Sequence, residues 1–135
     1  MKDELRWKQR FENFENAYHT FCRIYDAYRK NQKEEVNKIA LVQCFEFSLE
    51  LSWKTMKDYL EAKGYEMLQT PKDVIRRAFQ ADLITQPEAW MEAIEKRNHT
   101  SHIYKLEVLN DSVNFIENVF NKILDSLYVL LKKKL

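Results

Sequence analysis

Apolar side chains recur every three or four positions through most of the chain, which is the spacing of one face of an α-helix. The clearest run begins at Trp7 and ends at Tyr28, and it predicts a first helix of about seven turns with one aromatic stripe. Because the stripe is so regular, we interpret it as core rather than as a surface that stacks nucleic-acid bases. Its members are Trp7, Phe11, Phe14, Tyr18, Phe21, Tyr25 and Tyr28.

A second helix is predicted from about Glu35 to Lys63, and Gly64 should end it as a left-handed cap residue. Beside its main apolar stripe, Leu41, Phe47 and Leu51 lie on other faces. A helix that is apolar on more than one face must be covered on more than one face. In a short chain a second copy could supply that cover, so the pattern favours a two-fold homodimer. The main stripe consists of Val42, Phe45, Leu49, Trp53, Met56 and Leu60.

Capping signals predict a short third helix from about Pro71 to Ala81. Thr70 suits the N-cap position, proline suits the first turn, and Asp73 complements the helix dipole. Arg76 and Arg77 form a local basic pair on this helix. The pair is a candidate contact for RNA or a nucleotide, and a solvated helix face is the simpler interpretation.

Two further helices complete the pattern. Thr85 and Glu88 have capping-box spacing and predict a fourth helix that runs to Arg97. A last helix is predicted from about Glu107 to Lys133, because its apolar residues again alternate by three and four. With one glycine and two prolines, helix-breaking positions are rare. The sequence therefore predicts an all-α, five-helix up-and-down bundle with three long and two short helices, in one domain spanning residues 1–135. The apolar residues of the last helix are Val113, Ile116, Phe120, Ile123, Leu127 and Leu130.

Composition and charge limit the kinds of partner. The chain has 22 basic and 21 acidic residues, so it is no polycation that binds nucleic acid or anionic lipid over its whole surface. It begins with charged residues and has no uncharged run near the roughly 18 residues of a spanning helix, which predicts a cytoplasmic protein with no membrane association. Cys22 and Cys44 fall in apolar helical patterns, so we interpret them as buried free thiols. A single glycine rules out a glycine-rich phosphate loop, and we expect no cofactor.

Polar residues interrupt the helical patterns between Arg97 and His102. On a continuous helix these two side chains would point about 140° apart, so they could cooperate within one chain only if the helix ends between them. Thr100 and Ser101 favour such an ending. Arginine binds phosphate oxygens through a planar fork, and histidine exchanges a proton near neutral pH. Each residue also has a simple structural role, arginine at a helix C-terminus and histidine as a capping or partly buried ring.

Cleavage of RNA by the neighbouring 2′-hydroxyl needs a base, an acid and a cation beside the phosphate. One chain offers one suitable histidine at this position, so a two-fold dimer that faces two copies of His102 across a cleft would supply both proton-transfer groups. His99 is the alternative within one chain. His99 and His102 could also form a metal pair, but no third ligand has matching spacing, and we predict no metal site.

Arg97, His102 and Tyr104 spell R-x4-H-x-Y, which resembles the signature of the HepT-like HEPN family. Two longer segments, 45–60 and 70–79, resemble the branch of that family labelled nucleotidyltransferase substrate-binding proteins. Trp90 ahead of Arg97-Asn98 agrees with the same branch. The resemblance covers roughly residues 5 to 130.

The resemblance implies a small helical homodimer that pairs with a separately encoded minimal nucleotidyltransferase. In one interpretation the chain is the ribonuclease toxin of a HepT/MntA-type toxin–antitoxin pair, a metal-independent endoribonuclease. The resemblance then assigns catalysis to Arg97 and His102, with Asn98 as a polar helper, and the partner silences the toxin by AMPylation of Tyr104. In the other, the chain is a non-catalytic subunit that binds nucleotide or substrate for its partner. The resemblance leaves both interpretations open.

Overall fold

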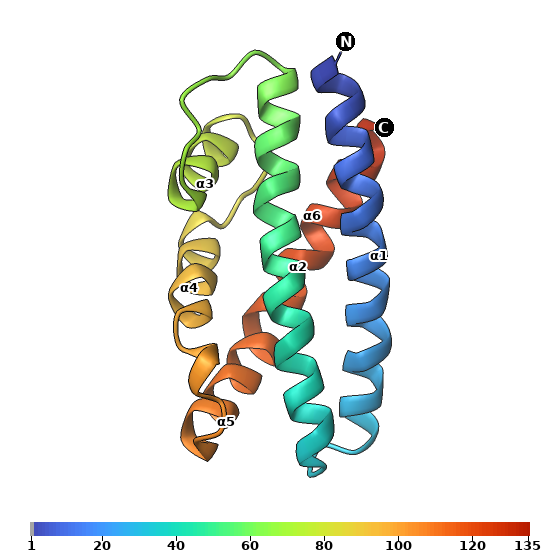
Figure 1. Ribbon diagram of the computed structural model, residues 1–135, viewed down its shortest axis with the longest axis vertical. Coiled ribbons are helices and arrows are strands. Elements are labelled where there is room, and N and C mark those ends of the chain that lie inside the picture. Colours follow the sequence, from blue (N-terminus) through green and yellow to red (C-terminus); the bar gives the residue numbers. More distant parts are fainter. Residues whose placement is uncertain (1) are drawn as a thin grey trace.

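The aromatic stripe of the first segment forms helix α1 (Lys2–Lys30), which packs along helix α2 (Glu35–Ala62) over most of its length in the computed structural model (Figure 1). The structure describes residues 2–135. Five of the seven stripe residues are buried, and Tyr18 and Tyr25 are partly buried against the core. The prediction that this stripe is core is therefore confirmed.

Helix α2 lies at the centre of the molecule, with α1 on one side and α3 (Pro71–Gln80) and α4 (Pro87–Arg97) on the other (Figure 1). This position explains why α2 is apolar on several faces. Leu41 is fully buried, and Leu51 packs against the core of its own chain. Only Phe47 of the second apolar set remains exposed, at 38%. The chain itself therefore covers Leu41 and Leu51, and of this set only Phe47 is left for a second copy to cover; the homodimer stays a prediction.

Gly64 ends α2 as the predicted left-handed cap residue, and the helix end follows the Schellman pattern. Gly64 has φ of 95°, in the left-handed region that glycine adopts without steric cost. Its N–H donates to the carbonyl of Glu61 (3.0 Å), and the N–H of Tyr65 donates to that of Leu60 (3.1 Å). These two bonds satisfy carbonyls that the helix end would otherwise leave unpaired.

The two short helices begin in different ways. Thr70 and Asp73 form a capping box at α3: the Thr70 hydroxyl accepts from the Asp73 N–H (3.2 Å), and the Asp73 carboxylate accepts from the Thr70 N–H (3.3 Å). Helix α4 instead starts at Pro87, with Gln86 at the N-cap and no side-chain capping bond. The predicted cap at Thr85 was therefore wrong. Proline needs no N–H partner and has a helical φ, so it sets the first position of the helix.

The last long helix contains a widened turn that the sequence pattern did not indicate. Helix α5 (Leu106–Phe115) continues through a π-helical turn, Ile116–Phe120, into α6 (Asn121–Lys134). The Asn121 N–H bonds to the Ile116 carbonyl five residues back, and the Asn121 side-chain amide also donates to that carbonyl (3.0 Å). The five helical rods match the predicted bundle, and residues 2–135 contain no strand.

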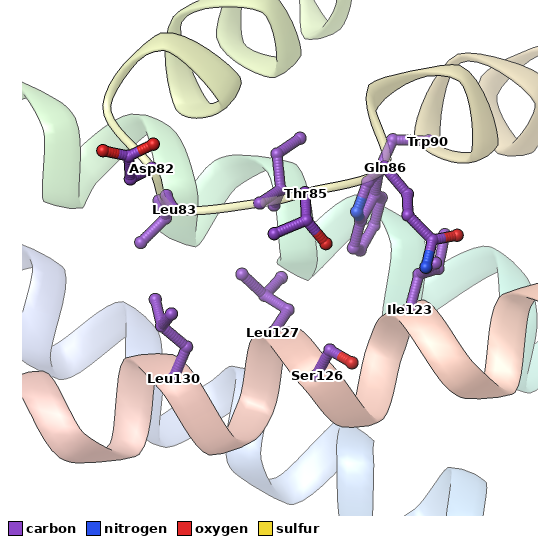
Figure 2. Close-up of a pocket in the computed structure, with 10 residues that line it drawn as sticks. Asp82, Leu83, Thr85, Gln86, Trp90, Ile123, Ser126, Leu127 and Leu130 are labelled. Atoms are coloured by element: carbon purple, nitrogen blue, oxygen red, sulfur yellow. The ribbon is translucent and has the colours of Figure 1, made fainter.

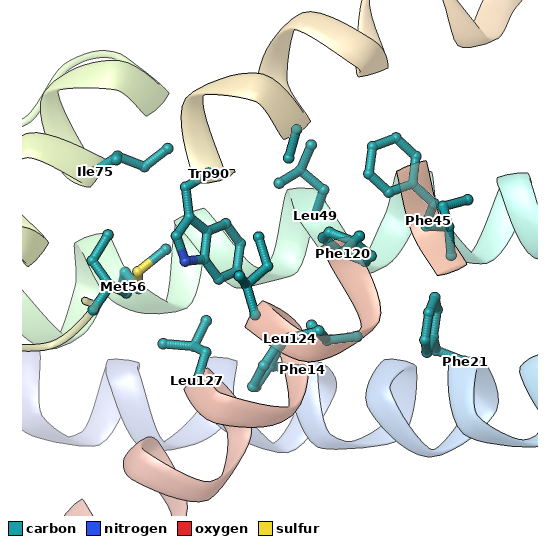
Figure 3. Packing of buried hydrophobic residues seen from close by; sticks show 14 of the residues in the cluster. Phe14, Phe21, Phe45, Leu49, Met56, Ile75, Trp90, Phe120, Leu124 and Leu127 are labelled. Atoms are coloured by element: carbon teal, nitrogen blue, oxygen red, sulfur yellow. The ribbon is translucent and has the colours of Figure 1, made fainter. Parts of the chain in front are cut away.

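The core fills the space between the α1–α2 pair, α4 and the last helix (Figure 3). Phe120 makes edge-to-face contacts with Phe45 of α2 (4.7 Å between ring centroids) and Trp90 of α4 (6.2 Å).

The two cysteines differ in burial. Cys44 is buried, and burial raises the pKa of its thiol to about 11, whereas Cys22 is only partly buried. The prediction of two buried thiols therefore holds for Cys44 alone. Every helix in the described range is too short or too polar to cross a bilayer.

Candidate functional site

The segment between α4 and α5 changes helix type within a few residues. Helix α4 ends at Arg97, with Asn98 as its C-cap, and a single 3-10 turn follows at Thr100–His102. The N–H of Asn98 bonds to the Glu95 carbonyl three residues back (3.1 Å), which tightens the last turn. The helix therefore ends between Arg97 and His102, as the sequence predicted.

Arg97 is anchored to helix α2. Its Nη1 lies 3.1 Å from Oε2 of Glu46 and 3.0 Å from Oγ1 of Thr100. Thr100, which is 2% exposed, donates its hydroxyl to the same Glu46 oxygen. The Arg97 side chain is 46% exposed. One nitrogen of the guanidinium is thus held in place, while a guanidinium has five N–H donors and leaves others for an anion.

A second carboxylate lies one turn further along α2. Burial opposes ionisation of Glu50, but hydrogen bonds from Lys54 and Trp53 and the nearby charge of Arg97 hold the pKa of its carboxyl below the ordinary value. Arg97 therefore forms an ion pair with Glu46, and its charge also acts on Glu50. A phosphate that binds at Arg97 must compete with this negative charge.

His102 and Tyr104 form a second pair at the surface. Nδ1 of His102 lies 3.1 Å from the Tyr104 hydroxyl, and the two rings meet edge to face with centroids 5.8 Å apart. Tyr104 is 75% exposed. If the tyrosine donates, the neutral imidazole carries its proton on Nε2. The Tyr104 hydroxyl is accessible to an external reagent and touches the histidine directly.

The predicted site residues of the segment between α4 and α5 thus fall into three groups. Arg97 contacts Glu46 and Thr100, and His102 contacts Tyr104. Asn98 and His99 are exposed on the connecting segment. The residues between 2 and 135 contain no group of three or more His, Cys, Asp or Glu side chains arranged to hold a metal ion.

Arg76 and Arg77 lie on α3, away from the connecting segment (Figure 1). Nη1 of Arg76 is 3.5 Å from an Asp73 oxygen, and the Arg77 guanidinium lies 5.6 Å from the centre of the Tyr65 ring. Both arginines have partners within the chain. The structure therefore does not bring this basic pair together with Arg97 and His102.

A groove of about 380 Å³ opens beside His102. It runs between the 3-10 turn and the first two turns of α5, and much of its surface is apolar. Its lining combines two imidazoles, one lysine, two carboxylates and one valine: His99, His102, Lys105, Glu107, Val108 and Asp111.

A smaller cavity of about 80 Å³ lies on another face of the bundle (Figure 2). Leu83 and Thr85 of the loop before α4 face Leu127 and Leu130 of α6. Half of its lining residues are aliphatic, and the lining contains one titratable side chain, Asp82, and no cation for phosphate binding. The groove at His102 is therefore the more suitable place for a polar ligand.

Comparison with known proteins agrees with this architecture. Residues 9–133 match the family model described as nucleotidyltransferase substrate binding protein like. The chain belongs to this family. The structure of HI0074 from Haemophilus influenzae, described as the fold of a substrate binding domain of a nucleotidyltransferase, is similar with a TM-score of 0.74 and 22% identity. The match covers 90% of this chain and 98% of that one, and it concerns the fold. No curated protein sequence gives a significant match.

In this member of the nucleotidyltransferase substrate-binding family, sequence reasoning missed two residues beside Arg97. Thr100 was considered only as a residue that ends a helix, and Glu46 only as part of the segment 45–60 that carries the resemblance. Thr100 and Glu46 are 54 positions apart, so no local pattern links them. The one available signal was a carboxylate at Glu46 directly beside the buried Phe45.

Proposed function

We propose that this chain is the substrate-binding subunit of a two-component nucleotidyltransferase, and that it holds a nucleotide for a separately encoded minimal nucleotidyltransferase. The observation that carries the proposal is the family match over residues 9–133. A subunit of this kind needs a site for an anionic ligand, and Arg97 supplies a partly exposed guanidinium in a fixed position.

The electrostatics support a shared site. Arg97 has Glu46 at 3.1 Å, and its charge also acts on Glu50. These carboxylates weaken the attraction of Arg97 for an isolated phosphate. A ligand therefore needs further contacts, from the neighbouring groove, from a second copy or from the partner. This requirement agrees with a subunit that functions within a complex.

The test is nucleotide binding by the chain, by the partner and by their complex. The complex should copurify, and the Arg97→Ala variant should bind nucleotide about 10- to 100-fold more weakly, as expected when a charge-assisted hydrogen bond is lost. Arg23→Ala is the matched control, because Arg23 is an exposed arginine on α1 that belongs to none of the candidate contacts. Equal binding by both variants would contradict the assignment of Arg97.

A second candidate function is a HEPN ribonuclease, and the contact between His102 and Tyr104 favours it. A base would take the proton of the RNA 2′-hydroxyl, whose oxygen then attacks phosphorus. The bond to the 5′-oxygen breaks, and an acid protonates that oxygen. His102 of two facing copies would supply acid and base in a homodimer, with His99 as the alternative partner. Arg97 would offset the phosphate charge, with Asn98 as a polar helper and no metal.

The same contact gives a route to regulation. In AMPylation the Tyr104 oxygen attacks the α-phosphorus of ATP, the bond to the departing pyrophosphate breaks, and the phenolic proton passes to a base. The product carries an anionic phosphodiester where the hydroxyl met His102. Modification would therefore remove the hydrogen bond to His102 and obstruct the approach of RNA phosphate.

Two measurements distinguish the ribonuclease from the binding subunit. Intact mass after co-expression with the partner should rise in AMP steps, and Tyr104→Phe should abolish the rise while Tyr65→Phe does not. The chain alone should cut RNA in the presence of chelator, and His102→Ala should lose cleavage while His19→Ala, another exposed histidine, retains it. An absence of cleavage at every concentration would favour the binding subunit.

A further inference from the structure

The groove beside His102 has a geometry that suits part of a nucleotide. Its volume of about 380 Å³ is large enough for a base and its ribose, and it shares His102 with the candidate site. Val108 is half-buried and provides an aliphatic surface at its base. The imidazole rings of His99 and His102 add flat faces, on which nucleobases stack in other proteins.

The charges in the groove are separated along the chain. Lys105 precedes the first turn of α5, next to the 3-10 turn that carries His102. Glu107 and Asp111 are four residues apart and share one face of α5. A ligand with an anionic end and a hydrogen-bond donor at the other end therefore fits this arrangement.

The carboxylates restrict which base fits. Ionised carboxylates accept hydrogen bonds and donate none. Oδ2 of Asp111 lies 2.8 Å from Lys96, which leaves Oδ1 for a ligand. Glu107 has no hydrogen bond or ion pair with any residue from 2 to 135. The exocyclic amino groups of adenine, cytosine and guanine each offer two N–H donors here, whereas uracil has no amino group and can donate only its ring N3–H.

We propose that this groove binds the base and ribose of a nucleotide with an amino-bearing base, with the phosphate directed toward Lys105 and His102 and so toward the candidate site that contains Arg97. The inference rests on the proposed nucleotide-binding function and identifies the part of the ligand that the groove takes. The base belongs either to a free nucleotide or to a residue of an RNA strand, and the two share the same recognition chemistry.

The test follows the methyl signals of Val108 by NMR while AMP, CMP, GMP, UMP or inorganic phosphate is added to the full chain. The three amino-bearing nucleotides should shift Val108 and bind about three- to tenfold more tightly than UMP, the discrimination expected of one hydrogen bond. Inorganic phosphate should leave Val108 unshifted. Val129 is the internal control, because it is an exposed valine on α6.

Variants test the role of the carboxylates. The double variant Glu107→Gln and Asp111→Asn keeps the side-chain shape but adds donors, so UMP should bind as tightly as AMP. Short oligoadenylate and oligouridylate form a second arm. If oligoadenylate binds at least tenfold more tightly than AMP, the ligand is a residue of an RNA strand. If oligoadenylate and AMP bind with equal affinity, the ligand is a free nucleotide.

A failure of the groove assignment and a failure of the proposed function give different results. If nucleotides bind in an Arg97-dependent manner but Val108 does not shift, or if UMP matches AMP in the unaltered chain, the groove assignment is wrong and the proposed function stands. If no nucleotide binds to the chain or to its complex with the partner, the proposed function and the groove assignment are both overturned.

Discussion

At the scale of single residues, Glu46 joins α2 to the end of α4 through its contacts with Arg97 and Thr100. The Glu46→Ala variant should lower the free energy of unfolding by about 1 to 2 kcal/mol, because it leaves a charge and a buried hydroxyl without their acceptor. The cost falls at the low end if the Thr100 hydroxyl turns to the Arg97 carbonyl, which lies 3.0 Å away. Urea denaturation measures the change.

Glu50→Ala is the control for this prediction. Its main partner, Lys54, lies one turn along the same helix at 3.0 Å, and both side chains are more than a third exposed. Ion pairs of this kind contribute about 0.3 to 0.5 kcal/mol. A loss for Glu46→Ala no greater than that for Glu50→Ala would show that the anchor of Arg97 contributes little to stability.

How much of the candidate site could be predicted depends on how far apart its residues lie in the sequence. The end of a helix between Arg97 and His102 followed from local polar residues, and the structure has it there. The contact of Thr100 with Glu46 spans 54 positions and is created by the packing of α4 against α2. Local patterns carry no information on such a contact, so the anchor of Arg97 emerged only from the fold.

At the scale of elements, the two short helices provide a matched test of capping. Thr70→Ala should destabilise the protein by about 1 kcal/mol, because it removes the hydroxyl that accepts from the Asp73 N–H. Thr85→Ala should change stability by less than about 0.5 kcal/mol, because α4 starts at Pro87 without a side-chain cap. Thermal unfolding of both variants measures the difference, and equal losses would contradict the assignment of the capping box.

The elements themselves were largely predictable, because amphipathic spacing and capping residues act over a few positions. Two details were not. The pattern could not choose between Thr85 and Pro87 as the signal that starts α4, since each has a valid local rule. The π-helical turn at Ile116–Phe120 keeps the apolar residues facing the core, so the spacing of three and four continued through it. Asn121 bonds to the Ile116 carbonyl of this turn, but in the sequence it cannot be told from any other polar residue on a helix.

At the scale of the whole molecule, Glu15 connects the first and last helices. Its carboxylate accepts hydrogen bonds from Lys132 and Tyr128 of α6, and these bonds hold its pKa below the ordinary value of 4.5. A lowered pKa means that the contribution to stability is present above the ordinary value and is lost as pH falls through the folded value. The Glu15→Gln variant should therefore be less stable than the unaltered chain at pH 7 and equally stable in acid.

Urea denaturation at neutral and acidic pH gives the two values for Glu15→Gln. Glu12→Gln is the control, since Glu12 is an exposed glutamate on the same helix. Its effect should be small and independent of pH. A deficit for Glu15→Gln that persists below the folded pKa would show that the variant acts through packing rather than through the charge.

The homodimer is the last prediction, and Phe47 is the residue that tests it. Three apolar side chains of α2 are exposed: Val36, Ile39 and Phe47, at 68%, 37% and 38%. Arg97 is attached to the same helix at Glu46, so two copies that pack around Phe47 would bring their Arg97 residues close together. This is the arrangement that a composite site requires.

Sedimentation equilibrium should give twice the 16.4 kDa mass of one chain, and Phe47→Asp should give the mass of one chain with unchanged helical circular dichroism. The matched control is Val129→Asp, which places the same charge at an exposed apolar residue of α6 and should remain dimeric. If Val129→Asp dissociates the dimer and Phe47→Asp does not, the two copies meet through α6. Because Arg97 is anchored to α2, an interface through α6 would leave each Arg97 without its counterpart, and a ribonuclease site would then have to be completed by His99 within one chain.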